Sequence, residues 1–174
     1  IYEIIHYKSE RMEFAFCHTG NFNENYYSFV NTQYTSDGGT HLAAFKEAIG
    51  KAICELSNKD LEYDDIRGGI TGAIAIKVQD PVFESQTKNK LGNTDIKAGI
   101  ITEVKQAIIA YLYKNPETKG QIFDKIDKNR SVRKQIQAVR KGAKELAQKS
   151  MLKIAKLRDC KYHLNEAESR RKED

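Results

Sequence analysis

An apolar run at residues 70–78 constrains the fold more than any other part of the sequence. It is rich in Ile and Ala and ends at Asp80 and Pro81, which predicts a buried central strand. On both sides of this run, at 42–56 and 96–112, apolar side chains recur every three or four residues, as on one face of a helix. The chain is therefore predicted to form one sheet with helices packed on it.

The first forty residues predict the rest of the sheet. Residues 2–18 are expected to form two strands, because charged or small side chains alternate with aromatic ones between Glu13 and Cys17. Residues 26–30 are aromatic and β-branched, which predicts a third strand. Residues 31–39 are expected to be a polar loop, and Thr40 is expected to cap the next helix.

A long helix is predicted after this body. Asn115 is expected to cap it and Pro116 to take its first position, and residues 116–157 are almost all helix formers. A coiled-coil seam is indicated by apolar residues at alternating steps of four and three, namely Val132, Ile136, Val139, Ala143 and Leu146. The predicted fold class is α/β, of the two-layer α+β type, with a long C-terminal helical arm. The expected divisions are a body at 1–114, an arm at 115–165 and a flexible tail at 166–174.

The charge is unevenly distributed along the chain. Residues 1–113 carry 11 Lys and Arg against 15 Asp and Glu (net −4), whereas residues 114–174 carry 18 against 9 (net +9). A strongly basic arm is typical of proteins that contact a nucleic-acid backbone without reading its bases. The candidate DNA-facing residues are Arg133, Lys134, Arg140, Lys141 and Lys144. An ordinary solvated helix face is the alternative interpretation.

Several other classes of protein find no support in the sequence. There is no run of eighteen apolar residues and no basic leader followed by an apolar segment, so neither a membrane span nor a secretory signal is expected. The spacing of Cys17, Cys54 and Cys160 suits neither a disulfide framework nor a zinc site, which favours a reducing, cytoplasmic setting, and no metal site is expected. The chain opens on Ile1 in strand-like sequence, so we expect it to be a segment of a longer protein.

Residues 81–93 are the strongest candidate site. They connect the predicted central strand to a helix, which is the usual position of a ligand loop in α/β proteins. Gln86, Thr87, Lys88 and Lys90 offer donors suited to phosphate oxygens, and a lysine acts on a phosphate as a point charge. A solvated connecting loop is the alternative.

Three groups of residues resemble the ATPase subunits of bacterial type IIA topoisomerases. F-E-S-Q-T-K-N-K-L-G at 83–92 is similar to the family's F-E-x-Q-T-K-x-K-L-G, and S-F-V-N at 28–31 with G-G-T-H at 38–41 matches a second family pattern. K-L-R-D-C at 156–160 resembles the K-L-x-D-C that precedes the family's Toprim domain. T-Q-Y-T at 32–35 is more similar to the topoisomerase IV branch than to the gyrase branch.

This resemblance implies the family's transducer domain, which has a left-handed β-α-β fold like domain 2 of small-subunit ribosomal protein five. It implies that Gln86 and Lys88 contact the γ-phosphate of ATP, with Lys88 as the catalytic residue and Thr87 and Lys90 as supporting residues. The full subunit would use ATP with Mg²⁺ to drive DNA strand passage, decatenation and relaxation. The fragment alone is expected to bind no cofactor and to be inactive, because its nucleotide pocket would lie in another domain.

The implied partners are the ATP-binding and Toprim domains of the same subunit, the DNA-cleaving A subunit of the heterotetramer, and double-stranded DNA, with no membrane. The implied location is the bacterial cytoplasm, at the nucleoid. Three alternatives stay open: the transducer of a gyrase B subunit, which supercoils DNA, a stand-alone nucleic-acid-binding module of the same fold, and a small-molecule kinase. The kinase would need its own Gly-rich phosphate loop, and the sequence has none.

Overall fold

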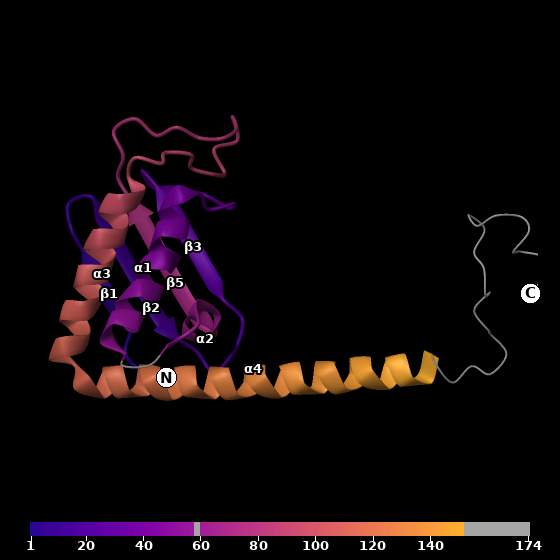
Figure 1. Cartoon of the computed structure of the whole chain (residues 1–174). Coiled ribbons are helices and arrows are strands. Elements are labelled where there is room, and N and C mark those ends of the chain that lie inside the picture. The colour runs from indigo at the N-terminus through magenta and orange to yellow at the C-terminus, as the bar shows by residue number, and fades with distance from the viewer. Residues whose placement is uncertain (58–59, 152–174) are drawn as a thin grey trace, which may run out of the picture. The chain divides into compact units, whose positions relative to one another are not determined.

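The computed structural model describes residues 1–57 and 60–151 of the 174-residue chain (Figure 1). Within these residues, five strands form one mixed sheet in the order β1-β2-β5-β3-β4. The strands are β1 (Ile5–Lys8), β2 (Met12–His18), β3 (Asn25–Val30), β4 (Gln33–Tyr34) and β5 (Ile70–Ile76). The helices in the same residues are α1 (Thr40–Leu56), α2 (Tyr63–Arg67), α3 (Lys97–Lys114) and α4 (Pro116–Met151). The predicted α/β class is confirmed, and β5 is the central strand.

The sheet and two helices form two layers. β3 and β5 are parallel neighbours connected through α1 and α2, so β3, α1 and β5 make a β-α-β unit. The remaining strand pairs, β1 with β2, β2 with β5 and β3 with β4, are antiparallel. α1 and α3 lie side by side on one face of the sheet (Figure 1).

The core lies between the sheet and these two helices. Met12, Phe14 and Phe16 alternate along β2 with less buried residues, so their side chains share the covered face. The ring of Phe45 on α1 contacts the rings of Phe14 and Phe16, with centroids 5.5 and 6.2 Å apart. Gly72 on β5 leaves room for this cluster, because a Cβ there would lie 3.2 Å from Phe45 Cε1. Aromatic packing and burial therefore stabilise the β2–β5–α1 contact.

The connecting segments contain two elements that the sequence did not predict. Residues 31–39 are not all loop, because Asn31 and Thr32 form a tight turn with φ of 48° and 70° that pairs β4 with β3. The segment between α1 and β5 contains the short helix α2, which reaches Arg67. A strand of two residues and a helix of five are too short to give a readable periodicity.

The structure changes two expectations about helix caps. Gly39, not Thr40, is the N-cap of α1, because Thr40 is the first helical residue and its hydroxyl donates to Leu91 O (3.3 Å). Asn115 occupies the expected cap position of α4, since its O accepts from Lys119 N (3.2 Å), but its side chain donates to Tyr111 O (2.9 Å) and closes the C-terminus of α3. Pro116 takes the first position of α4, as predicted.

The chain divides into two compact units, Ile1–Arg133 and Lys134–Asp174. The first unit includes the first half of α4, because Ile122 and Ile126 are buried (1% and 0% exposed). In the second unit the described residues continue α4 to Met151, and Ile136, Val139 and Leu146 of the predicted seam are exposed. The predicted boundaries at residues 114 and 165 stay predictions, and the K-L-R-D-C motif lies outside the described residues.

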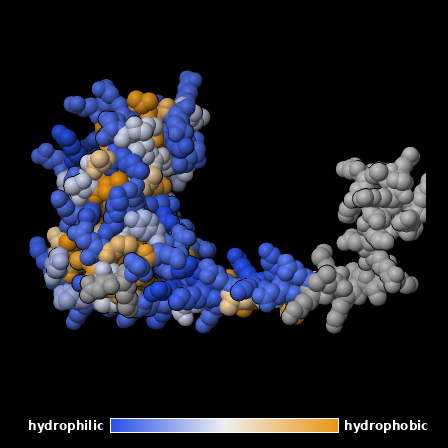
Figure 2. Space-filling model, in the orientation of Figure 1, coloured by the Kyte–Doolittle hydropathy of each residue, from blue (hydrophilic) through white to orange (hydrophobic). Residues whose placement is uncertain are grey.

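The helices in the described ranges include none that is long and apolar enough to cross a membrane. The visible face of the first unit is largely hydrophilic, with small separate hydrophobic areas (Figure 2).

Candidate functional site

The segment between β5 and α3 forms a hairpin-like tongue, which we define as residues 82–92. Glu84 N donates to Lys90 O (3.0 Å), and Gly92 N donates to Val82 O (2.8 Å). Phe83 and Leu91 lie opposite each other as an antiparallel bridge. The backbone of the predicted site is therefore paired along its two sides.

Gln86 and Thr87 are the central residues of a turn at the tip of the tongue. Ser85 O accepts a hydrogen bond from Lys88 N (3.0 Å), and the hydroxyl oxygens of Ser85 and Thr87 lie 2.6 Å apart. Lys88 follows with a left-handed φ of 55°, which is uncommon for a residue with a side chain. Gln86, Thr87 and Lys88 are all exposed. The tip thus presents an amide and an ammonium donor to the solvent.

The two candidate lysines of the tongue, Lys88 and Lys90, have different environments in the structure. Lys90 Nζ pairs with Glu84 Oε2 on the opposite side of the tongue (2.9 Å), so its charge is compensated locally. Lys88 Nζ forms no ion pair with any of the described residues. Lys88 is consequently the lysine of the tongue that is available to an added anion, while Lys90 helps to hold the two sides together.

The base of the tongue is fixed to the start of α1. Leu91 is buried, its N donates to Gly38 O (3.1 Å), and its O accepts from Thr40 N (3.0 Å). Gly39 has φ of 125°, and a Cβ there would lie 2.4 Å from Leu91 O, closer than any side chain tolerates. The two motifs at 38–41 and 83–92 are therefore one structural unit, joined by contacts between residues about fifty positions apart.

The S-F-V-N motif supports the same end of the sheet. The Asn31 side chain donates to Val78 O (2.8 Å) and accepts from Val78 N (2.9 Å), which fixes the chain where it leaves β5. Ser28 Oγ donates to Thr35 O (3.0 Å), and Thr35 Oγ1 lies 3.3 Å from His41 Nε2. Burial lowers the pKa of His41 to about 4, so this ring is neutral at pH 7. Sequence reasoning did not single out Asn31 as a support, since its partner is a backbone group.

Both ring nitrogens of His18, which follows Cys17 in the sequence, lie within hydrogen-bond distance of other residues of the fold. Its Nδ1 lies 2.6 Å from Tyr2 Oη and its Nε2 lies 2.7 Å from Ile66 O. Burial lowers the pKa of His18 to about 4. In residues 1–57 and 60–151, no three His, Cys, Asp or Glu side chains are grouped so that they could hold a metal ion.

The candidate DNA-facing residues fall into two environments. Arg133 is in ion pairs with Asp65 (2.7 Å) and Glu62 (2.6 Å). The other four candidates are exposed on α4 in the second unit, namely Lys134, Arg140, Lys141 and Lys144. A DNA-contact hypothesis thus depends on these four residues, which form no ion pair with any other residue that the structure describes.

Comparison with known proteins identifies relatives over most of the chain. The profile of the family described as DNA gyrase B matches residues 2–142. The B subunit of DNA topoisomerase 4 from Borreliella burgdorferi is 45% identical over 167 residues, which are 96% of this chain and 28% of that protein. The B subunit of DNA gyrase from Clostridium acetobutylicum is 34% identical over 86% of this chain and 25% of its own length. The chain spans about a quarter of these curated relatives.

Solved structures show the same fold. The 43K ATPase domain of Thermus thermophilus gyrase B, solved with an aminocoumarin, has a TM-score of 0.69 and 25% identity, covering 81% of this chain and 42% of that one. The topoisomerase IV ATP-binding domain of Francisella tularensis has a TM-score of 0.64 and 27% identity, covering 75% and 39%. The resemblance stated from the sequence motifs is confirmed.

Proposed function

The chain belongs to the DNA gyrase B family, and from this premise we propose that it is the transducer part of a topoisomerase IV-type B subunit. The 45% identity to a topoisomerase 4 protein, against 34% to a gyrase protein, supports the choice of branch. In this proposal, Gln86 and Lys88 contact the γ-phosphate of an ATP that is bound with Mg²⁺ by another domain of the same subunit. The observation that carries it is the exposed tip, where both donors stand on a turn whose base is fixed to α1.

The chemistry of these residues suits a phosphate that is present in ATP and absent from ADP. Lys88 Nζ and Gln86 Nε2 donate hydrogen bonds to phosphate oxygens, and Lys88 adds a positive charge. A hydrogen bond to a charged group contributes about 1.5–3 kcal/mol. Loss of the γ-phosphate therefore shifts an equilibrium between two domain arrangements by about tenfold or more.

The fold connects the tongue to α4. The tongue and the first half of α4 lie at opposite ends of the sheet (Figure 1). β5 leads into the tongue, and α3 runs from the tongue to the start of α4. Because these elements are packed in one core, a displacement of the tongue moves the body as a rigid piece. The proposed outcome in the whole enzyme is ATP-coupled passage of one DNA duplex through another, with decatenation and relaxation, together with the A subunit.

Substitution of Lys88 tests this function. We expect Lys88→Ala, in the complete subunit assembled with its A subunit, to keep ATP binding and to lower ATP turnover at least tenfold, since it removes the charge that senses the γ-phosphate. Steady-state ATP hydrolysis and decatenation of linked DNA circles are the measurements. Lys77→Ala, which changes an exposed lysine just beyond β5, is the matched control and should behave as wild type. Wild-type turnover in Lys88→Ala would contradict the assigned role.

A further inference from the structure

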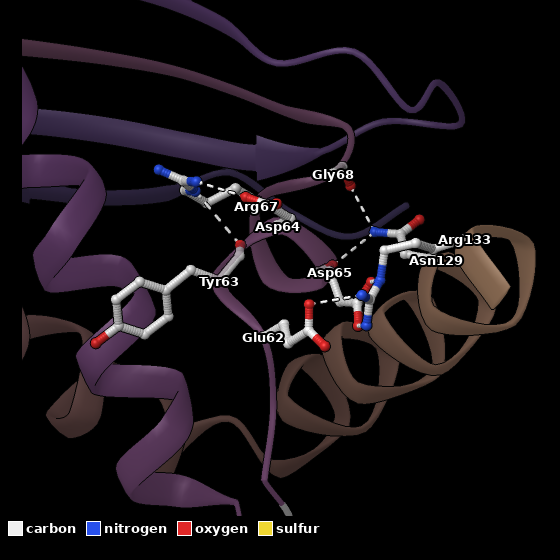
Figure 3. Close-up of polar contacts among 8 residues, drawn as sticks. All are labelled: Glu62, Tyr63, Asp64, Asp65, Arg67, Gly68, Asn129 and Arg133. Atoms are coloured by element: carbon white, nitrogen blue, oxygen red, sulfur yellow. Dashed lines mark hydrogen bonds and ion pairs between the residues drawn. The ribbon is translucent and has the colours of Figure 1, made fainter. Parts of the chain in front are cut away.

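Two side chains of α4 bind α2 and the segment after it (Figure 3). Asn129 Nδ2 donates to Asp65 O (2.8 Å) and to Gly68 O (2.7 Å). Arg133 Nε donates to Asp65 Oδ1 (2.7 Å), and its Nη2 donates to Asp65 Oδ2 (2.8 Å). We call Asp65, Asn129 and Arg133 the latch.

The contact between Asp65 and Arg133 fixes direction as well as distance. Two parallel hydrogen bonds join the planar guanidinium to the carboxylate, so a rotation of either group breaks at least one of them. The Asp65 side chain is only 2% exposed, so Arg133 provides the charge that its burial requires. Glu62 Oε2 accepts from the remaining Nη1 of Arg133 (2.6 Å). The hydrogen bonds from Arg133 to Asp65 raise the pKa of Arg133 still further, although a guanidinium is charged in any case.

The latch is the last attachment of α4 within the first compact unit, which ends at Arg133. Earlier in the helix, Ile122 and Ile126 are buried and Lys125 Nζ donates to Asn21 O (3.0 Å). Beyond Arg133 the side chains of α4 from residue 134 to 148 are exposed. The latch thus lies where the packed part of the helix ends.

The latch also lies at one end of the strand whose other end leads to the tongue. Gly68, an acceptor for Asn129, is two residues before the start of β5 at Ile70. β5 has seven residues and spans about 20 Å at roughly 3.3 Å per residue. A single rigid strand therefore connects the tongue base to the point where α4 is held.

We propose that Arg133 is a positioning residue for strand passage, which acts by holding α4 to α2 so that a movement of the body is passed to the rest of the helix. This inference rests on the proposed function and deepens it. It gives Arg133 a role through Asp65 in place of a contact with DNA. The expected consequence is that the latch governs how many strand passages each ATP yields, while ATP turnover depends on Lys88.

The test compares Arg133→Gln and Arg133→Lys in the complete subunit assembled with its A subunit. We expect Arg133→Gln to lower the number of strand passages per ATP hydrolysed about tenfold, with ATP turnover within about twofold of wild type. Arg133→Lys keeps the charge but not the two parallel bonds, so we expect a loss of about threefold. Because both residues form one interaction, Asp65→Asn combined with Arg133→Gln should be no worse than Arg133→Gln alone.

Arg67 provides the matched control, since it pairs with Asp64 of the same helix (2.9 Å) and forms no hydrogen bond or ion pair with the described part of α4 (Figure 3). Arg67→Gln should keep the wild-type ratio of passages to ATP. An equal loss in Arg67→Gln, or a wild-type ratio in both Arg133 variants, would overturn the latch. A weaker DNA affinity with a shallower salt dependence in Arg133→Gln would also overturn it, in favour of a DNA contact.

Two measurements in the same experiment separate failure of the latch from failure of the proposed function. If Arg133→Gln does not fold, Arg133→Lys carries the test, and an unchanged ratio there contradicts the latch. Lys88→Ala is assayed beside these variants: wild-type turnover in Lys88→Ala refutes the proposed γ-phosphate role. Reduced turnover in Lys88→Ala with unchanged ratios in the Arg133 variants refutes the latch alone. If the wild-type complex itself shows no strand passage, the latch and the proposed function are both refuted.

Discussion

At the scale of single residues, two buried histidines determine how the body responds to acid. His18 and His41 are both 0% exposed, and burial lowers the pKa of each to about 4 from a usual value of 6.5. The unfolded chain therefore binds more protons than the folded one between these values. Their neutral state stabilises the fold fully above pH 6.5, and this contribution is lost as the pH falls toward 4.

We predict that the free energy of unfolding of residues 1–174 falls as the pH is lowered from about 7 to about 4.5, with about 2 kcal/mol from each buried histidine. His41→Gln should remove about half of this dependence, because glutamine stays neutral and can still bond Thr35. Urea denaturation at the two pH values measures this change in the free energy of unfolding. His6→Gln is the control, since His6 is exposed on β1, and should keep the wild-type slope. A wild-type slope in His41→Gln would show that burial does not control this group.

At the scale of elements, the exposed part of α4 carries the DNA-binding hypothesis. The four exposed basic residues of this part are Lys134, Arg140, Lys141 and Lys144. We predict that changing all four to Gln weakens DNA binding by the complete subunit and lowers the slope of log affinity against log salt by about 3.6, since each neutralised phosphate contact contributes about 0.9.

Filter binding or fluorescence anisotropy across a range of salt concentrations measures this slope. The matched control neutralises four body lysines that are already paired with glutamates, namely Lys8, Lys51, Lys97 and Lys105. An unchanged slope in the α4 variant, or an equal change in the control, would mean that α4 does not contact DNA.

The elements also show what the sequence could predict. β5 was predicted from its continuous apolar run, and α1 from apolar side chains that recur every three or four residues. α2 and β4 were missed because five residues and two residues give no period. The sequence did not show that the Asn115 side chain bonds the end of α3, because that depends on which of the two neighbouring helices the side chain reaches.

The candidate site, like the fold, was predictable from the sequence only in part. The resemblance drew attention to Gln86 and Lys88, and the structure exposes both. The pairing of Lys90 with Glu84, and the close approach of Leu91 to Gly39, arise only when the tongue folds on itself and onto α1. No local pattern encodes a contact between residues about fifty positions apart.

At the scale of the whole molecule, the first unit is a packed body with the tongue at one end of its sheet and the first half of α4 at the other (Figure 1). One core joins α1, α3 and β5, so neither end moves without the body. In the proposed cycle, the γ-phosphate holds the tongue and the latch holds α4. The central claim is that Lys88 distinguishes ATP from ADP.

Chemical protection of Lys88 in the complete subunit tests this claim most directly. The subunit is treated with an amine-acylating reagent in the presence of a non-hydrolysable ATP analogue or of ADP, and the labelled lysines are quantified by mass spectrometry. Lys77, an exposed lysine just beyond β5, is the internal reference. We predict that the analogue lowers the acylation of Lys88 at least fivefold relative to ADP and leaves Lys77 unchanged. Equal acylation of Lys88 in the two nucleotide states would contradict the account.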